Sequence, residues 1–231
     1  MPSANRSTRM EEVRQTEKDV DKFNYTVERR FGPKRNIIFQ RRDHDDYQRK
    51  NAIIGDSIVF GIYDRDAVTI SCPGGTVQSL VSGAILRDLK AWGVEKIAVM
   101  VGTNSLFANS DNSQVMTPLM VRDEIEYLVR YFRFEGFDVT VLSLIARERN
   151  WSTIRRLNRY LREMCLDESV YFHKVLKFQY KRHICADGIH PKASATRDLA
   201  RDFRAALGVI QSRTYDHTIN SRNLKPCNSR K

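Results

Sequence analysis

The amino-acid sequence predicts an α/β protein, a three-layer α/β/α domain around a central parallel sheet of about five strands. From residue 51 onward, short apolar runs alternate with longer segments in which apolar residues recur every three or four positions. The run 96–101 is almost continuously apolar, which is typical of a strand buried on both faces of a parallel sheet. Because right-handed crossovers join such strands, helices are expected on both faces.

The predicted elements are short strands separated by helices with recognisable end signals. The strands cover residues 52–54, 67–72, 96–101, 138–144 and 170–172, and the helices cover 76–92, 118–135, a segment from 152 onward, and 193–207. Thr117 and Pro118 provide an N-cap and a first-turn proline, and Ser152 is predicted to cap the next helix. Gly93 and Gly136 stand where helix C-termini commonly have a glycine.

Residues 51–207 therefore form the predicted domain, between a basic, polar arm over 1–50 and a basic tail over 208–231. The arm holds few aliphatic residues, so we expect it to be flexible or loosely attached. A short polar helix is expected over 11–21. Only 37–39 offers an apolar segment able to rest on the domain.

The net charge of +11 is concentrated at the two ends of the chain. Residues 1–50 hold 13 Lys and Arg against 9 Asp and Glu, and residues 208–231 hold 5 against 1. Basic ends contact nucleic acid or other anionic surfaces in many proteins, but they also simply keep a chain in solution. Charge alone does not separate these two roles.

The cysteines and the N-terminal residues indicate an intracellular protein. Cys72, Cys165, Cys185 and Cys227 include no CxxC pair, and scattered cysteines are typical of a reducing compartment. Residues 1–30 are polar and charged, which argues against a signal peptide, and no run reaches the length of a membrane span. We expect a cytoplasmic or nuclear location rather than secretion.

Small and polar residues follow the predicted strands and precede the last helix. They are Gly55, Asp56 and Ser57 after the first strand, Gly74 and Gly75 after the second, Asn104 after the third, and Asp187 and His190 before the last helix. Taken singly, each has an ordinary explanation as a cap, a turn or a surface residue. Together they indicate a site at the carboxyl ends of the strands, where α/β sheets bind their ligands.

The order and placement of these four blocks resemble those of the SGNH hydrolases, the GDSL esterase/lipase family, over about residues 51–207. The resemblance implies a flavodoxin-like strand order and a nucleophile, Ser57, with His190 as its base and Asp187 orienting the imidazole. The residue types suit the chemistry, because a serine hydroxyl needs a base and histidine side chains titrate near neutrality. An aspartate stabilises the charged imidazole.

The resemblance also implies an oxyanion hole, formed by the backbone N–H groups of Ser57 and Gly74 and the side-chain amide of Asn104. Gly74 is assigned in preference to Gly75 because the family pattern has this glycine two residues before a threonine, here Thr76.

Two positions depart from the family pattern, although neither takes part in making or breaking bonds. The family usually has an aspartate where this chain has Ser105 and a leucine where it has Ile58. A looser likeness, over 53–59, 72–80 and 139–144, is to esterase-type domains in animal genomes and in the first open reading frame protein of some non-LTR retrotransposons.

The predicted function is hydrolysis of a small O-acyl, acetyl-type ester through an acyl-enzyme on Ser57, without a cofactor. His183, Cys185, Asp187 and His190 lie close together in the sequence, but their spacing matches no established metal site. No metal is therefore predicted.

An arginine-rich stretch supports an alternative function. It contains Arg147, Arg149, Arg155, Arg156, Arg159 and Arg162. Arg155, Arg159 and Arg162 share one face of the predicted helix, which is either merely solvated or binds an anion. The alternative is a weakly active or inactive SGNH-like scaffold that binds RNA or another anionic partner through this helix and the basic tails. The oligomeric state is left open.

Overall fold

The computed structural model describes residues 14–19, 25–31, 36–42, 49–107, 116–145, 150–175, 180–185 and 187–209. Its strands are β1 Arg14–Asp19, β2 Tyr25–Phe31, β3 Asn36–Arg42, β4 Asn51–Gly55, β5 Ala67–Ser71, β6 Lys96–Met100, β7 Asp138–Leu142 and β8 Tyr171–His173. Its helices are the 3₁₀ helix η1 Val77–Leu80, α1 Gly83–Ala91, α2 Thr103–Phe107, α3 Pro118–Phe134, α4 Trp151–Asp167, α5 Tyr180–His183 and α6 Ala193–Ala206.

The strands form one eight-stranded sheet in the order β1-β2-β3-β5-β4-β6-β7-β8. The five strands β5-β4-β6-β7-β8 are parallel, which confirms the predicted α/β class and the five-stranded parallel sheet. Counted along the chain from β4, their order is 2-1-3-4-5, the flavodoxin-like order that the family resemblance implied.

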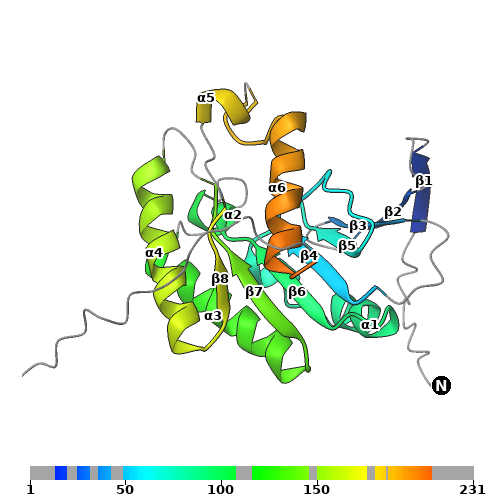
Figure 1. The fold of residues 1–231 in the computed structure, drawn as a ribbon, viewed down its shortest axis with the longest axis horizontal. Coiled ribbons are helices and arrows are strands. Elements are labelled where there is room, and N and C mark those ends of the chain that lie inside the picture. Colours follow the sequence, from blue (N-terminus) through cyan, green and yellow to red (C-terminus); the bar gives the residue numbers. More distant parts are fainter. Residues whose placement is uncertain are drawn as a thin grey trace, which may run out of the picture.

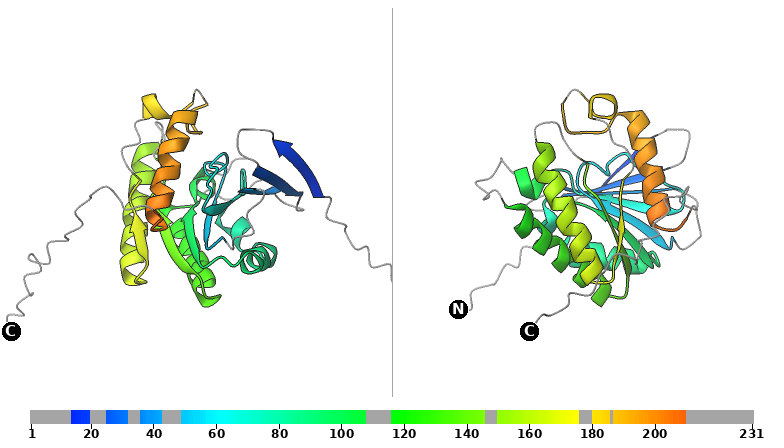
Figure 2. Two further views of the ribbon diagram at one scale, coloured as in Figure 1. Left: turned by 45° about the vertical axis from the view of Figure 1, so that its right-hand side comes forward. Right: turned by 60° about the vertical axis from the view of Figure 1, so that its left-hand side comes forward.

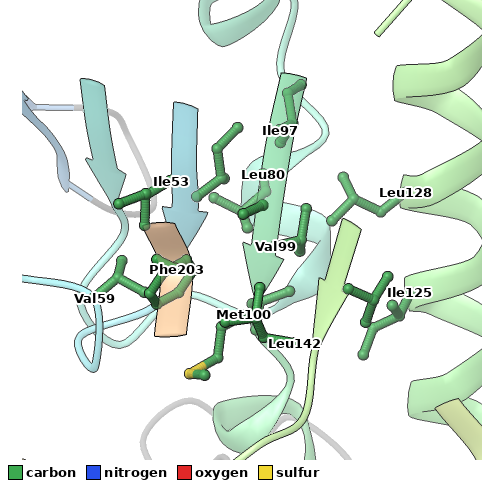
Figure 3. Packing of buried hydrophobic residues seen from close by; sticks show 14 of the residues in the cluster. Ile53, Val59, Leu80, Ile97, Val99, Met100, Ile125, Leu128, Leu142 and Phe203 are labelled. Carbon is green, nitrogen blue, oxygen red and sulfur yellow. The ribbon is translucent and has the colours of Figure 1, made fainter. Parts of the chain in front are cut away.

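Helices cover both faces of the parallel strands, with α3 and α4 on one face and α6 on the other (Figures 1 and 2). On the α6 face, Phe203 packs near Ile53 and Val59, and all three are fully buried (Figure 3). On the α3 face, Ile125 and Leu128 lie toward the sheet (Figure 3). None of the helices in the described ranges combines the length and apolarity that a membrane crossing requires.

The sheet extends further toward the N-terminus than the sequence predicts. Strand β3 pairs antiparallel with β5, and β2 and β1 continue the sheet outward. Phe39 is only 1% exposed, so the expectation of a loosely attached arm is wrong for this part of the chain. The apolar segment 37–39 does rest on the domain, as a strand. The polar helix expected over 11–21 is also wrong, because Arg14–Asp19 is a strand paired with β2.

Contacts with α1 explain how such charged strands join the fold. The Arg30 guanidinium pairs with Asp88 of α1 and with Glu28, whose carboxylate lies at 2.8 Å. The same guanidinium lies over the Phe39 ring, 4.5 Å from its centroid, and that ring meets Trp92 edge-on at 5.6 Å. These pairings link positions far apart in the sequence, so periodicity within the arm does not reveal them.

The helix ends agree with the sequence signals at three places, Thr117, Gly93 and Gly136, and differ at two others. The Thr117 hydroxyl accepts a hydrogen bond from the Met120 N–H, which confirms the predicted N-cap. Gly93 follows α1 with a left-handed φ of 69°, as predicted for a helix C-terminus. The segment 76–92 is two helices, η1 and α1, rather than one. Helix α4 has Asn150 as its N-cap, so Ser152 lies inside the first turn.

Candidate active site

The carboxyl ends of three neighbouring strands stand level with one another, because the register pairs Gly55 of β4 with both Ser71 of β5 and Met100 of β6. The segments that follow these strands carry the predicted nucleophile Ser57 and the predicted oxyanion donors. The sheet register therefore explains why blocks separated by tens of residues meet at one edge.

A tight turn after β4 holds Ser57 at the edge of the sheet. A Cβ atom on Gly55 would stand 2.3 Å from the Met100 carbonyl oxygen, so no larger residue fits where the chain leaves the strand. Asp56 is 1% exposed, and its carboxylate accepts a hydrogen bond from the Ile58 N–H at 3.0 Å. This bond spans Ser57, which remains partly exposed.

The loop before α6 brings Asp187 and His190 together. Its two arms are joined by hydrogen bonds from the Cys185 N–H to the His190 carbonyl and from the Lys192 N–H to the His183 carbonyl, each 2.8 Å long. Within the loop, the Asp187 carboxylate accepts the N–H groups of Ile189 at 2.8 Å and of His190 at 3.0 Å. The backbone thus fixes the carboxylate before it contacts the imidazole.

The three predicted catalytic side chains form one continuous chain of hydrogen bonds. His190 Nδ1 lies 2.7 Å from the second Asp187 carboxylate oxygen, and His190 Nε2 lies 3.1 Å from Ser57 Oγ. An ionised carboxylate only accepts hydrogen bonds, so Nδ1 carries the proton. The lone pair of Nε2 then faces the serine hydroxyl, which is the arrangement a general base requires.

The electrostatics of the loop keep Asp187 ionised. Its hydrogen bond with the His190 side chain is the largest effect, followed by those from the backbone N–H groups of His190 and Ile189, and together they lower the pKa of Asp187 to about 2. The carboxylate therefore stays charged throughout the neutral range, as an orienting partner for the imidazole must.

The Gly74 turn presents a backbone donor on the same edge. Cys72, Pro73, Gly74 and Gly75 form a β-turn closed by the Gly75 N–H and the Cys72 carbonyl at 2.8 Å, with Gly74 at a φ of 68°. Such a turn favours proline at its second position and glycine at its third. The Gly75 N–H is thus used by the turn, whereas the N–H groups of Gly74 and Ser57 have no acceptor in the described parts of the chain.

Asn104 lies in the first turn of the short helix α2 and reaches toward the same turn. Its side-chain amide donates to the Gly75 carbonyl at 3.0 Å. An amide has two N–H groups, so a second one remains available for another acceptor. The residues named from the sequence, Ser57, Gly74, Asn104, Asp187 and His190, thus all stand where the strands β4, β5 and β6 and the loop before α6 end.

Two supporting residues carry no signal in the sequence. Gln40 of β3 is 1% exposed, and its side-chain oxygen accepts the Gly61 N–H at 3.4 Å, in the segment after the nucleophile. Glu124 of α3 accepts a hydrogen bond from the Ser105 hydroxyl at 3.3 Å. Both pairs join distant segments.

The described ranges contain no group of three or more His, Cys, Asp or Glu side chains arranged to hold a metal ion.

The predicted arginine stripe lies on the outer face of α4. Its apolar residues Ile154, Leu157 and Leu161 are fully buried. Arg155, Arg156, Arg159 and Arg162 are all exposed. The other two arginines of the stretch, Arg147 and Arg149, lie outside the described residues. The structure thus supports the amphipathic placement but does not by itself assign the stripe a partner.

Comparisons with known proteins bear on the fold. No protein-family model matches the chain, and no curated protein matches it either. Among solved structures, a GDSL-like lipase from Bacteroides thetaiotaomicron superposes with a TM-score of 0.55 at 12% identity, over 70% of this chain and 89% of that one. The acetylxylan esterase Axe2 from Geobacillus stearothermophilus gives 0.54 at 17% identity, over 69% and 94%.

A third solved structure, the acetyl xylan esterase AlAXEase, gives a TM-score of 0.57 at 12% identity, over 68% of this chain and 99% of that one. These similarities confirm that the chain has the fold of the GDSL, or SGNH, hydrolases. None of these three structures bears on the likeness to retrotransposon proteins, which stays a prediction.

Proposed function

We propose that the protein is a serine esterase that hydrolyses a small O-acyl ester. The observation that carries the proposal is the hydrogen-bonded chain Asp187–His190–Ser57, with its 2.7 and 3.1 Å links, on the edge of the sheet where two unused backbone N–H groups also lie. A partly exposed serine held by a histidine, itself held by a charged carboxylate, is the constellation of nucleophilic acyl transfer.

The first half of the reaction forms an acyl-enzyme. Ser57 Oγ attacks the ester carbonyl carbon while its proton passes to His190 Nε2. The carbonyl oxygen becomes an oxyanion, for which the N–H groups of Ser57 and Gly74 and the second amide hydrogen of Asn104 are the proposed donors. When the intermediate collapses, the carbon–oxygen bond to the alcohol breaks and the alcohol takes the proton from Nε2.

The second half uses the same groups with water as the nucleophile. His190 Nε2 accepts a proton from water, whose oxygen attacks the acyl carbon, and then returns a proton to Ser57 Oγ as the acid is released. Every step is a proton transfer or an acyl transfer among these side chains, the substrate and water. The mechanism therefore requires no cofactor.

An acetyl-type acyl group is part of the proposal. Its support is that solved structures with this fold include enzymes named as acetylxylan esterases. An intracellular location, expected from the sequence, remains a prediction.

The proposal is tested with purified protein and a short activated acetyl ester. Wild type should hydrolyse this ester, whereas Ser57→Ala and His190→Ala should each lower kcat by several orders of magnitude, since the two residues act as a unit. A serine-reactive phosphonate should label wild type at Ser57. A folded wild type that neither turns over the ester nor reacts with the phosphonate would refute the esterase proposal.

A second candidate function, binding of single-stranded RNA, rests on the outer face of α4. The guanidinium of Arg155 stacks over the Trp151 ring at 5.0 Å, and that of Arg159 lies 5.4 Å from the Tyr160 ring centroid. Trp151 is 54% exposed. An exposed aromatic ring among cations is what stacking bases and phosphates require.

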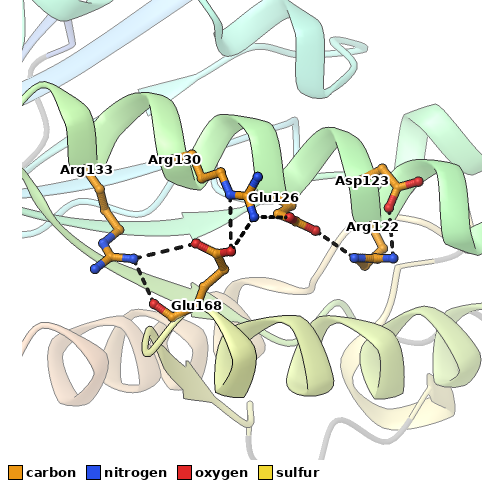
Figure 4. A network of polar contacts seen from close by, with 6 residues as sticks. All are labelled: Arg122, Asp123, Glu126, Arg130, Arg133 and Glu168. Atoms are coloured by element: carbon orange, nitrogen blue, oxygen red, sulfur yellow. Dashed lines mark hydrogen bonds and ion pairs between the residues drawn. The ribbon is translucent and has the colours of Figure 1, made fainter.

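The charges of α4 differ from those of the neighbouring helix. On α3, Arg130 pairs with Glu126 at 2.7 Å and with Glu168 at 2.6 Å, and Arg133 contacts the Glu168 backbone carbonyl at 2.7 Å (Figure 4). By contrast, no ion pair within the described ranges neutralises the four exposed arginines of α4. Their charge is therefore available to an anionic ligand.

This candidate is tested by fluorescence anisotropy with a labelled single-stranded RNA. Affinity should fall steeply between 50 and 200 mM salt, by roughly 10- to 100-fold if about four phosphates are contacted. Arg155→Gln combined with Arg159→Gln should weaken binding, whereas Arg130→Gln combined with Arg133→Gln on α3 removes the same charge and serves as the matched control. Equal binding by the two variants would locate the RNA elsewhere, and no binding at low salt would exclude this function.

A further inference from the structure

Two hydrogen bonds tie the Gly74 turn, and the helix η1 that follows it, to α2, which carries Asn104. The first runs from the Asn104 amide to the Gly75 carbonyl at 3.0 Å. The second runs from the Val77 N–H, at the start of η1, to the Ser105 hydroxyl oxygen at 3.3 Å. The position of the Gly74 N–H relative to the Asn104 amide, two of the three proposed oxyanion donors, therefore depends on both bonds.

The second bond depends in turn on a residue of α3. The Ser105 side chain is 2% exposed and its hydroxyl donates to the Glu124 carboxylate at 3.3 Å. A hydroxyl has one proton, and a carboxylate only accepts. The Ser105 proton must therefore point at Glu124, which leaves a lone pair directed at the Val77 N–H. Without Glu124, the hydroxyl is free to rotate and the bond to Val77 loses its fixed direction.

Glu124 is distinguished from its acidic neighbours by this contact. Asp123 pairs with Arg122 at 3.0 Å, and Glu126 pairs with Arg122 at 2.6 Å, so these two acids serve the charge network on the surface of α3 (Figure 4). Glu124 instead points from the same helix into the junction between α2 and η1. Buried Val121 and Ile125 on either side of it anchor this part of α3 to the core.

We propose that Glu124 is a positioning residue for the oxyanion hole and acts through the Ser105 hydroxyl. The inference rests on the proposed esterase function and adds to it a residue that never touches the substrate. Because the oxyanion donors act on the charge that develops in the transition state, misplacing them lowers kcat and leaves substrate binding nearly unchanged.

The experiment compares kcat and KM for the activated acetyl ester in Glu124→Ala, Ser105→Ala and the double variant. We expect each single change to lower kcat about 10-fold, less than the ~10²–10³ typical of deleting a donor, with KM within about twofold. The double variant should lose no more than either single one, since the two residues form one relay. Asp123→Asn, one position away on α3, is the matched control.

Moving the negative charge from residue 124 to residue 105 distinguishes a positioning role of Glu124 from a general loss of stability in the variants. Ser105→Asp introduces a carboxylate beside Glu124, so we expect repulsion and a lower kcat. Adding Glu124→Gln should then raise kcat, because an aspartate at 105 accepts the Val77 N–H without help. The inference is overturned if Glu124→Ala keeps kcat within twofold of wild type, if the two losses add, or if Glu124→Gln does not rescue Ser105→Asp.

A measurement on backbone amide groups tests this inference separately from the esterase proposal. If wild type neither hydrolyses the ester nor reacts with the phosphonate, the esterase proposal fails by itself. The same variants are then compared by the amide NMR signals of Gly74 and Val77. Glu124→Ala should shift both signals and Asp123→Asn neither, and unshifted signals in Glu124→Ala would overturn the positioning role.

Discussion

Replacing Phe39 with alanine measures how firmly β3 belongs to the domain. The ring is 1% exposed, meets Trp92 edge-on at 5.6 Å and lies beneath the Arg30 guanidinium at 4.5 Å. Truncating a buried phenylalanine costs about 3–5 kcal/mol, which includes the cavity that remains. Domains are stable by only about 5–15 kcal/mol, so the loss should be a large fraction of the total.

The assay is urea unfolding followed by far-UV circular dichroism, with Phe134→Ala as the control. Phe134 is 90% exposed at the end of α3, so the same chemical change there should alter the free energy of unfolding by less than about 0.5 kcal/mol. The m-value should stay constant for both variants, which would attribute the shift in midpoint to stability.

A small effect at Phe39 would contradict the structural argument. If Phe39→Ala costs no more than Phe134→Ala, then β3 is not part of the cooperative core, and the extension of the sheet beyond β5 has to be withdrawn. A separate early transition in the fluorescence of Trp92, followed in a Trp151→Phe background so that it is the only tryptophan, would instead indicate that β2 and β3 unfold before the parallel sheet.

Two further predictions follow from shifted pKa values. Because the pKa of Asp187 is lowered to about 2, its carboxylate stabilises the fold above its ordinary pKa of about 3.9 and loses this effect as the pH falls toward 2. The Asp187 side chain is 45% exposed, so its contribution to the free energy of unfolding should be about 1 kcal/mol or less. The difference between wild type and Asp187→Asn in stability to urea should therefore narrow as the pH falls from about 4 to 2. A difference that widens over this range would contradict the prediction. Burial raises the pKa of the Cys165 thiol to about 12, so a thiol reagent at about pH 8 should modify the partly exposed Cys185 in the native protein and reach Cys165 only in urea. Equal rates for Cys165 in native and unfolded protein would refute this expectation.

The parallel sheet and the candidate catalytic residues could be predicted because their signals are local. Strands β4 and β6 are largely apolar runs of five residues, and Ser57 and Asn104 follow them closely. Parallel strands share a carboxyl edge, so strand ends that are remote in sequence become neighbours without any knowledge of their side-chain contacts. The alternation of strands and helices is enough to gather these residues on one edge.

The N-terminal strands could not be predicted because their stabilising contacts are not local. Arg30 stands in a run of charged residues that looks solvated, yet it pairs with Asp88, 58 positions away, and covers Phe39. The prediction of Ser152 as the N-cap of α4 was wrong for a related reason. Ser152 and Asn150 are both acceptable N-caps by residue type, and the choice between them depends on where the chain turns into the helix.

The acidic residues of α3 show where sequence reasoning stops. Asp123, Glu124 and Glu126 are equivalent by residue type, and a helical pattern places all three outside the apolar stripe. In the folded chain, two of them pair with arginines, whereas Glu124 meets the Ser105 hydroxyl. What separates them is the packing of α3 beside α2, which is a tertiary property. A residue proposed to act through another at the candidate site therefore becomes visible only once the fold is known, although the candidate catalytic residues were already predicted from the sequence.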